Sequence, residues 1–201
     1  MVKLLILFLV TYLLGSIPTG YLLVKWVKGF DIRTKGSGNI GMTNVWRNAG
    51  APSGIFTLIL DILKGVFAVL LAKFYSPVGQ EMEAIVFSAF FVLLGNVFPV
   101  FLNFKGGKGI GVSVGIFFSL LPIESTAGLV VFILAVLITR IISVGSLLSV
   151  TTMLVFTFIK LGFGWFSGLA LLAGLLVWWT HRQNIKRILS GTENQIGKKT
   201  G

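Results

Sequence analysis

Cysteine is absent from the 201 residues of this chain, and only one histidine and six acidic residues are present. Without cysteine the chain can form no disulfide and no thiolate metal site. One histidine and a few scattered carboxylates also lack the ligand spacing of a zinc or two-metal centre. We therefore expect no metal and no other cofactor.

Charge is scarce as well. Only 11% of the residues are charged and 55% are hydrophobic, against about 25% charged in ordinary soluble domains. Apolar runs of about 17–25 residues predict membrane spans, and these lie near 4–24, 54–74, 84–103 and 125–142, with shorter ones near 110–122, 146–160 and 166–181. No linker or shift in composition divides the chain. The prediction is an all-α integral membrane protein, a bundle of about seven transmembrane helices forming one domain over residues 1–201.

The basic residues predict the orientation, because short loops rich in lysine and arginine stay on the cytoplasmic side. With seven spans the two ends lie on opposite faces. One face then collects 13 of the 17 basic residues: Lys25, Lys28, Arg33, Lys35, Arg47, Lys105, Lys108, Arg140, Arg182, Lys186, Arg187, Lys198 and Lys199. We expect the N-terminus outside and the C-terminus in the cytoplasm.

The formal net charge of +11 raises the alternative of a nucleic-acid partner. No RNA- or DNA-binding module is visible in the sequence, and the distribution of the charge fits membrane topology and attraction to anionic lipid. We expect membrane lipid, and no nucleic acid, as a partner.

Two glycine-rich stretches interrupt the apolar helices, at residues 36–41 and 105–109. Glycine lets backbone N–H groups close on an anion, and lysine adds a point charge beside them. Next to the first stretch, Arg47 can hold a phosphate through two hydrogen bonds. The second stretch leads directly into a predicted helix, whose N-terminus favours anions, although it lacks the spacing of a Walker A motif. Both loops indicate a phosphorylated ligand at the membrane surface.

Polar residues elsewhere keep two interpretations open. His181 and Asn184 lie on one face of a helix where the last span meets water; the histidine is either a proton carrier or a bystander. Ser143 and Ser146 are either site residues or helix caps. The stretch 15–20, which contains Pro18, predicts a kink with close helix packing.

Two ionisable residues lie inside the second predicted span. Asp61 and Lys64 are three residues apart and can face each other across one helical turn. Ionisable groups are costly in a membrane and are usually paired or functional. We favour a structural ion pair over a catalytic carboxylate.

Taken together, these stretches resemble the bacterial membrane acyl-phosphate:glycerol-3-phosphate acyltransferases over nearly the whole chain. The resemblance rests on residues 12–18, 36–39, 105–109, and Asn44, Arg47, His181, Asn184, Ile185, Arg187, Gly191 and Glu193. It implies active-site roles for Ser37, Arg47, Lys108, Ser146, His181 and Asn184, and substrate binding by Gly38, Asn39, Asn44, Lys105, Gly106, Gly107, Gly109 and Ser143. One departure is Gly111-Val112, where alanine and threonine are common in the family.

The resemblance implies a reaction in the bacterial inner membrane. A fatty acyl group passes from acyl phosphate to the 1-hydroxyl of glycerol 3-phosphate, giving lysophosphatidic acid and phosphate, the first step of phospholipid synthesis. Because the acyl donor is already activated, positioning and charge stabilisation can suffice. The base is either His181 or the leaving phosphate. A membrane carrier for phosphate or glycerol phosphate is the alternative, although such a site is expected near the middle of the bilayer.

Overall fold

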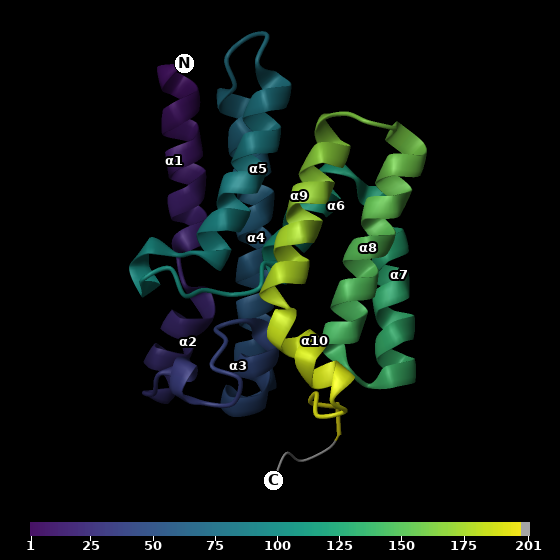
Figure 1. Ribbon diagram of the computed structural model, residues 1–201. Coiled ribbons are helices and arrows are strands. Elements are labelled where there is room, and N and C mark those ends of the chain that lie inside the picture. Colours follow the sequence, from purple (N-terminus) through teal and green to yellow (C-terminus); the bar gives the residue numbers. More distant parts are fainter. Residues whose placement is uncertain (198–201) are drawn as a thin grey trace. The chain divides into compact units, whose positions relative to one another are not determined.

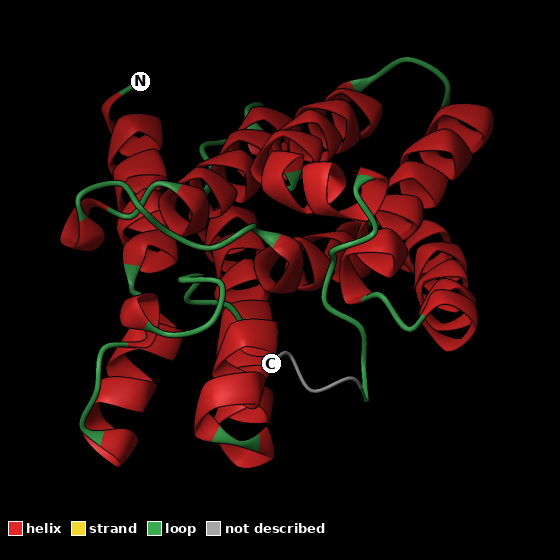
Figure 2. Cartoon of the chain, turned by 60° about the horizontal axis from the view of Figure 1, so that its bottom comes forward, coloured by secondary structure: helices red, strands yellow, loops and turns green. Residues whose placement is uncertain are grey.

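The computed structural model describes residues 1–197, and this part of the chain contains helices and loops but no strand (Figure 2). Its α-helices, labelled in Figure 1, are α1 (Val2–Ser16), α2 (Thr19–Lys28), α3 (Met42–Ala49), α4 (Ala51–Tyr75), α5 (Glu81–Val97), α6 (Ile110–Leu120), α7 (Pro122–Thr139), α8 (Ile142–Leu161), α9 (Trp165–Thr180) and α10 (Arg182–Leu189). Two short 3₁₀ turns, η1 (Ile32–Thr34) and η2 (Val100–Leu102), complete the secondary structure of this range.

Five stretches of the described chain are long and apolar enough to cross a membrane. They are Val2–Lys28, Ala51–Tyr75, Glu81–Leu102, Pro122–Thr139 and Ile142–Leu161, and the apolar helices α6 and α9 are shorter. The predicted all-α membrane protein is confirmed. Helix α8 is longer than the predicted span near 146–160, because it already begins at Ile142. Arg140, the C-cap residue of α7, has a φ of 60° and ends that helix just before. An all-helical span satisfies its own backbone hydrogen bonds, which lipid cannot do.

The first predicted span is broken in the middle, as the sequence around Pro18 indicated. Helix α1 ends at Ser16, Ile17 is extended, and α2 begins at Thr19. Proline has no N–H to donate and disfavours helical backbone in the residue before it. One membrane segment is therefore two helices with an interruption between them.

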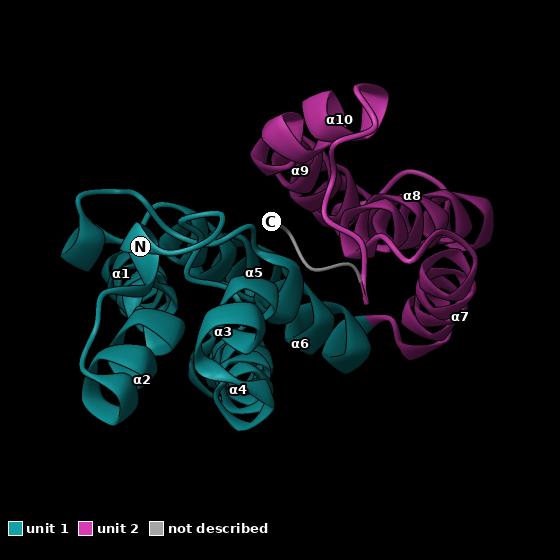
Figure 3. Cartoon of the chain, turned by 90° about the horizontal axis from the view of Figure 1, so that it is seen from below, with its two compact units in different colours: residues 1–120 teal, residues 121–201 magenta. Residues whose placement is uncertain are grey.

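The chain divides into two compact units, residues 1–120 and a second that begins at Leu121 (Figure 3). In the first unit, α1 packs against α5 and α4 packs against α6. Glycines bring these backbones close: a side chain at Gly15 would collide with the carbonyl of Val92 on α5, and one at Gly115 with the carbonyl of Ile62 on α4. The close packing predicted for the stretch 15–20 is thus confirmed.

In the second unit, α7 packs against α8, and α8 packs against α9. Glu124 at the start of α7 is buried and forms an ion pair with Lys160 at the end of α8, with 2.9 Å between Oε1 and Nζ. Trp178 on α9 donates to the Thr151 hydroxyl on α8 at 3.2 Å. The first contact joins α7 to α8, and the second joins α9 to α8 at another position along the helix.

Large apolar side chains remain exposed along the spans, including Leu9 on α1, Phe67 on α4, Leu137 on α7 and Ile159 on α8. A soluble protein rarely exposes so many contiguous apolar side chains. In lipid these side chains need no covering, so their exposure agrees with membrane embedding.

Candidate functional site

The first glycine loop, residues 36–41, joins η1 to α3. Gly36 and Gly38 have φ of 56° and 70°, in the left-handed region where residues with a side chain are strained. Both glycines are therefore required by the path of the chain itself, whatever the loop binds.

Asn44, in the first turn of α3, holds this loop in shape. Its side-chain carbonyl accepts from the Ser37 N–H at 3.0 Å, and its amide nitrogen donates to the carbonyls of Lys35 at 3.0 Å and Asn39 at 2.8 Å. Asn39 in turn accepts from the Gly41 N–H at 2.8 Å. Asn39 and Asn44, both predicted to bind substrate, thus form side-chain hydrogen bonds with the loop backbone. Their contact with substrate stays a prediction.

Among the predicted site residues of this loop and helix, Ser37 and Arg47 are exposed. Arg47 lies in the last turn of α3, one turn beyond Asn44. The loop and α3 therefore offer a hydroxyl and a guanidinium from one hydrogen-bonded substructure. Such a pair suits a phosphate or another anion.

The second glycine loop folds back onto the end of α5. The N–H of Gly106 donates to the carbonyl of Val97 at 3.1 Å, and that of Gly107 to the carbonyl of Asn96 at 3.0 Å. A side chain at Gly106 would collide with the Asn96 carbonyl, so this glycine is required by packing. Two of the N–H groups expected to cradle an anion are thus used within the fold.

The donors that follow them in sequence are the Lys108 ammonium and the first turn of α6. The first N–H groups of a helix have no partner within the helix, and its dipole favours an anion there. Gly111 lies in this turn, and a Cβ on it would be 2.8 Å from the Asp61 Cβ on α4. Gly111 therefore lets α6 approach α4 closely.

In the second unit, His181 lies between α9 and α10 and is only 2% exposed. Its Nδ1 is 2.8 Å from the Val177 carbonyl. A carbonyl can only accept, so Nδ1 carries the proton. In the neutral ring Nε2 is then the nitrogen able to accept one.

Glu193 organises the residues around Asn184. Its Oε1 accepts from the Ser143 hydroxyl at 2.8 Å and from the Asn184 amide at 2.5 Å, and its Oε2 accepts from the Arg187 Nε at 2.6 Å. Burial raises the pKa of this carboxyl, but the hydrogen bonds from Asn184, Arg187 and Ser143 outweigh burial and hold the pKa below its ordinary value of 4.5. The carboxylate thus joins α10 to the start of α8.

Site prediction from the sequence did not include Glu193, although it is the one acidic residue after Glu124 and follows a basic helix. Ser146, which was predicted as a site residue, donates to the Ile142 carbonyl at 3.0 Å. Neither it nor Ser143 caps α8, whose N-cap residue Ile141 has no side-chain cap. The structure therefore brings Ser143 and Asn184 together through Glu193, and it gathers Ser37, Asn39 and Asn44 in one loop.

This fold and these residues define a class: a membrane-embedded, all-helical protein with glycine loops and cationic side chains suited to a phosphorylated ligand. The family model of glycerol-3-phosphate acyltransferase matches residues 5–191. The chain belongs to this family, and it is an integral membrane acyltransferase.

Relatives match this chain over almost its full length. A glycerol-3-phosphate acyltransferase of Geobacter sulfurreducens is 42% identical, over 96% of this chain and 97% of the relative. Two crystal structures of PlsY (YgiH), an integral membrane glycerol 3-phosphate acyltransferase, are also similar. The glycerol 3-phosphate form has a TM-score of 0.89 and 34% identity over 96% of both chains. The lysophosphatidic acid form has a TM-score of 0.86 and 33% identity over 96% of this chain and 95% of the other.

Proposed function

We propose that this protein transfers a fatty acyl group from acyl phosphate to the 1-hydroxyl of glycerol 3-phosphate. The products are lysophosphatidic acid and inorganic phosphate. The observation that carries the proposal is the likeness, over 96% of both chains, to a structure of PlsY in its glycerol 3-phosphate form. The basic glycine loops, which suit phosphate groups, support it from this chain's own residues.

The reaction is an acyl transfer between two oxygen atoms. The glycerol 1-oxygen attacks the carbonyl carbon of the acyl phosphate, a carbon–oxygen ester bond forms, and the bond from that carbon to the phosphate oxygen breaks. Phosphate leaves with the bonding electrons. Arg47 and Lys108 neutralise phosphate charge, and Ser37, Ser146 and Asn184 orient reacting groups by hydrogen bonds.

The proton of the attacking hydroxyl goes to the leaving phosphate, which is basic enough to accept it. His181 positions the reacting groups in this proposal. Its Nδ1 proton, directed at the Val177 carbonyl, leaves Nε2 as the ring atom that can take part. A His181→Gln variant that binds both substrates normally but completes no turnover in a single-turnover assay would favour the histidine as the base.

The proposal also includes the setting of the enzyme. It lies in the bacterial inner membrane with its N-terminus outside and its C-terminus and active site at the cytoplasmic face, as the distribution of basic residues favours. Acyl phosphate reaches the site from the lipid and glycerol 3-phosphate from water. Residues 1–201 act as a single membrane-embedded domain in this proposal.

The test uses purified protein in lipid vesicles with acyl phosphate. We expect phosphate release that depends on added glycerol 3-phosphate, together with one equivalent of lysophosphatidic acid. A Lys108→Met variant should lose most of this activity. The matched control is Lys35→Met, which removes an exposed lysine beside the first loop and outside the predicted site. Uptake of either phosphate compound into the vesicles without chemistry would identify a carrier and refute the proposal.

A further inference from the structure

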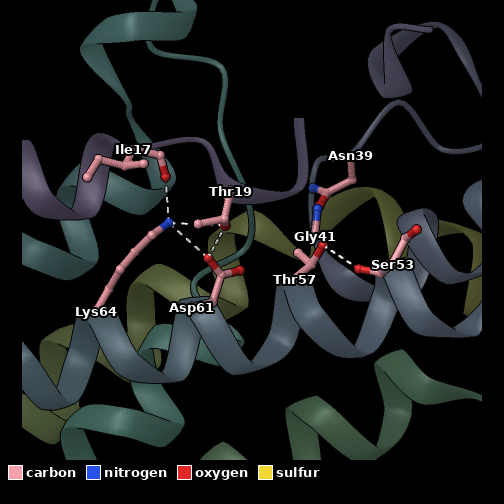
Figure 4. Close-up of polar contacts among 8 residues, drawn as sticks. All are labelled: Ile17, Thr19, Asn39, Gly41, Ser53, Thr57, Asp61 and Lys64. Atoms are coloured by element: carbon pink, nitrogen blue, oxygen red, sulfur yellow. Dashed lines mark hydrogen bonds and ion pairs between the residues drawn. The ribbon is translucent and has the colours of Figure 1, made fainter. Parts of the chain in front are cut away.

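The interruption between α1 and α2 is bound by a charged side chain from another helix. The carbonyl of Ile17, the residue between the helices, accepts from the Lys64 ammonium on α4 at 2.5 Å (Figure 4). Pro18 follows Ile17 and has no N–H. This carbonyl also accepts from the Thr19 N–H at 3.0 Å, and inside a membrane both donors must come from the protein, because lipid offers none.

Asp61 and Thr19 complete this contact. Lys64 Nζ is 2.9 Å from Asp61 Oδ1 and 3.2 Å from Thr19 Oγ1, and the Thr19 hydroxyl donates to the same Asp61 oxygen at 2.6 Å. The three ammonium hydrogens thus have three acceptors, as Figure 4 shows. The ion pair predicted between Asp61 and Lys64 is confirmed, and Thr19 joins it to the first turn of α2.

The same cluster adjoins the first glycine loop. Gly20, next to Thr19, lies so close to the Ile40 carbonyl that a side chain at 20 would collide with it, and a Cβ there would also be 3.0 Å from the Thr57 Cγ2 on α4. Gly20 thus lies close both to Ile40 of this loop and to Thr57, one turn of α4 from Asp61. The position of α2 therefore fixes where this loop lies on α4.

Asp61 also adjoins the start of α6, which follows the second glycine loop. The ideal Cβ of Gly111, in the first turn of α6, would lie 2.8 Å from the Asp61 Cβ and 3.6 Å from its Oδ2. Lys108 precedes Gly111 by three residues. One partly buried carboxylate thus lies between the start of α6, which follows the Lys108 loop, and the start of α2, which abuts the Ser37 loop.

We propose that Thr19, Asp61 and Lys64 act as a clamp that positions the two glycine loops relative to each other. They are positioning residues, not catalytic ones. A buried ion pair in a membrane helix is costly, and apolar residues often stabilise a fold as well or better. The contacts to a helix break, to the start of α2 and to the start of α6 give the pair a geometric role. Its kinetic consequence rests on the function proposed above.

The kinetic test replaces Thr19 by valine, which keeps the shape and removes the hydroxyl. We expect kcat/KM for glycerol 3-phosphate to fall about tenfold or more, because small misplacement of binding groups is costly to transfer reactions. Thr19→Ser should restore most of it. The matched control is Thr57→Val on α4, whose hydroxyl bonds only the Ser53 carbonyl of its own helix at 2.8 Å and is buried. This control should behave like the parent protein.

A second measurement reports on the loops without any reaction. The chain has no cysteine, so Lys35→Cys and Phe104→Cys give one spin label beside each loop, both at exposed positions of the first unit. In lipid, well below the melting temperature, the distance distribution should broaden or shift in Thr19→Val and Asp61→Asn. It should stay unchanged in Thr57→Val.

The outcomes separate the two proposals. A folded Thr19→Val protein with an unchanged distance distribution and normal kcat/KM overturns the clamp. If the parent protein releases no phosphate with glycerol 3-phosphate, while the distribution still changes in Thr19→Val, the proposed function is wrong and the clamp stands. If Thr19→Val only lowers the melting temperature and leaves both the distribution and the kinetics unchanged, the cluster is merely stabilising, and the clamp is also overturned.

Discussion

Arg47 differs from the other cations of the predicted site in the geometry of its side chain. A planar guanidinium holds two phosphate oxygens at once, whereas lysine supplies a point charge. We expect Arg47→Lys to lower kcat/KM by about tenfold or more, although the charge is kept, since a bidentate contact becomes a single one. Steady-state kinetics with both substrates checks this. Arg33→Lys is the control, because Arg33 forms an ion pair with Asp31 outside the site, with 2.6 Å between Nη2 and Oδ2. Near-normal efficiency of the Arg47 variant would remove Arg47 from the site.

Glu193 gives a prediction about pH. Its pKa is lowered in the folded protein, so its stabilising contribution is complete above the ordinary value of 4.5 and is lost as the pH falls through the lowered pKa. Glu193→Gln should cost on the order of 1–3 kcal/mol at pH 7, since Arg187 loses its partner. The difference in melting temperature between the parent and the variant should shrink as the pH falls below 4.5. A difference that is the same at pH 7 and pH 3 would contradict this account.

At the scale of helices, the crossing of α1 and α5 depends on the small size of Gly15 and not on a left-handed backbone. Gly15 is helical, and a side chain there would meet the carbonyl of Val92, which cannot move without breaking α5. Gly15→Ala should therefore lower stability by about 1–3 kcal/mol, the usual cost of overpacking. Gly168→Ala is the matched control, because a Cβ at 168 meets nothing within 4 Å and alanine favours helix. Melting temperatures in detergent measure this cost. Equal melting temperatures for the two variants would refute the close contact between Gly15 and α5.

Helices and their interruptions follow largely from the sequence. Apolar runs predicted the long spans, Pro18 predicted the break, and the three-residue spacing predicted the pair of Asp61 and Lys64. Each of these depends on local chemistry. The 3₁₀ turn after Pro99 and the shift of α7 to Pro122–Thr139 were not predicted, because they depend on single backbone angles such as that of Arg140.

The candidate site was harder to predict, since side chains there bond across long sequence separations. Residue types at 36–41 and 105–109 indicated two anion-binding loops. The pattern did not reveal that Gly106 and Gly107 donate to α5, or that Asn44 holds its own loop, because those contacts exist only once the chain has folded back. The role of Glu193 was not predicted for the same reason, since its partner Ser143 lies 50 residues away.

For the whole molecule, the positive-inside rule predicts which loops face outward. The chain is free of cysteine, so a single Val78→Cys between α4 and α5 reports one side and Lys28→Cys at the end of α2 reports the other. Val78 is 98% exposed. In intact cells a membrane-impermeant thiol reagent should label Cys at 78 and should reach position 28 only after permeabilisation. The reverse pattern would invert the proposed topology.

The contact between Ile17 and Lys64 also bears on biogenesis. The two residues are 47 positions apart, so the ribosome makes the carbonyl well before the ammonium that binds it. While α4 is still unmade, the break in the first membrane segment has only its own local N–H donors, such as that of Thr19 at 3.0 Å. A newly inserted α1–α2 segment therefore lacks the Lys64 donor to the Ile17 carbonyl until α4 has been made.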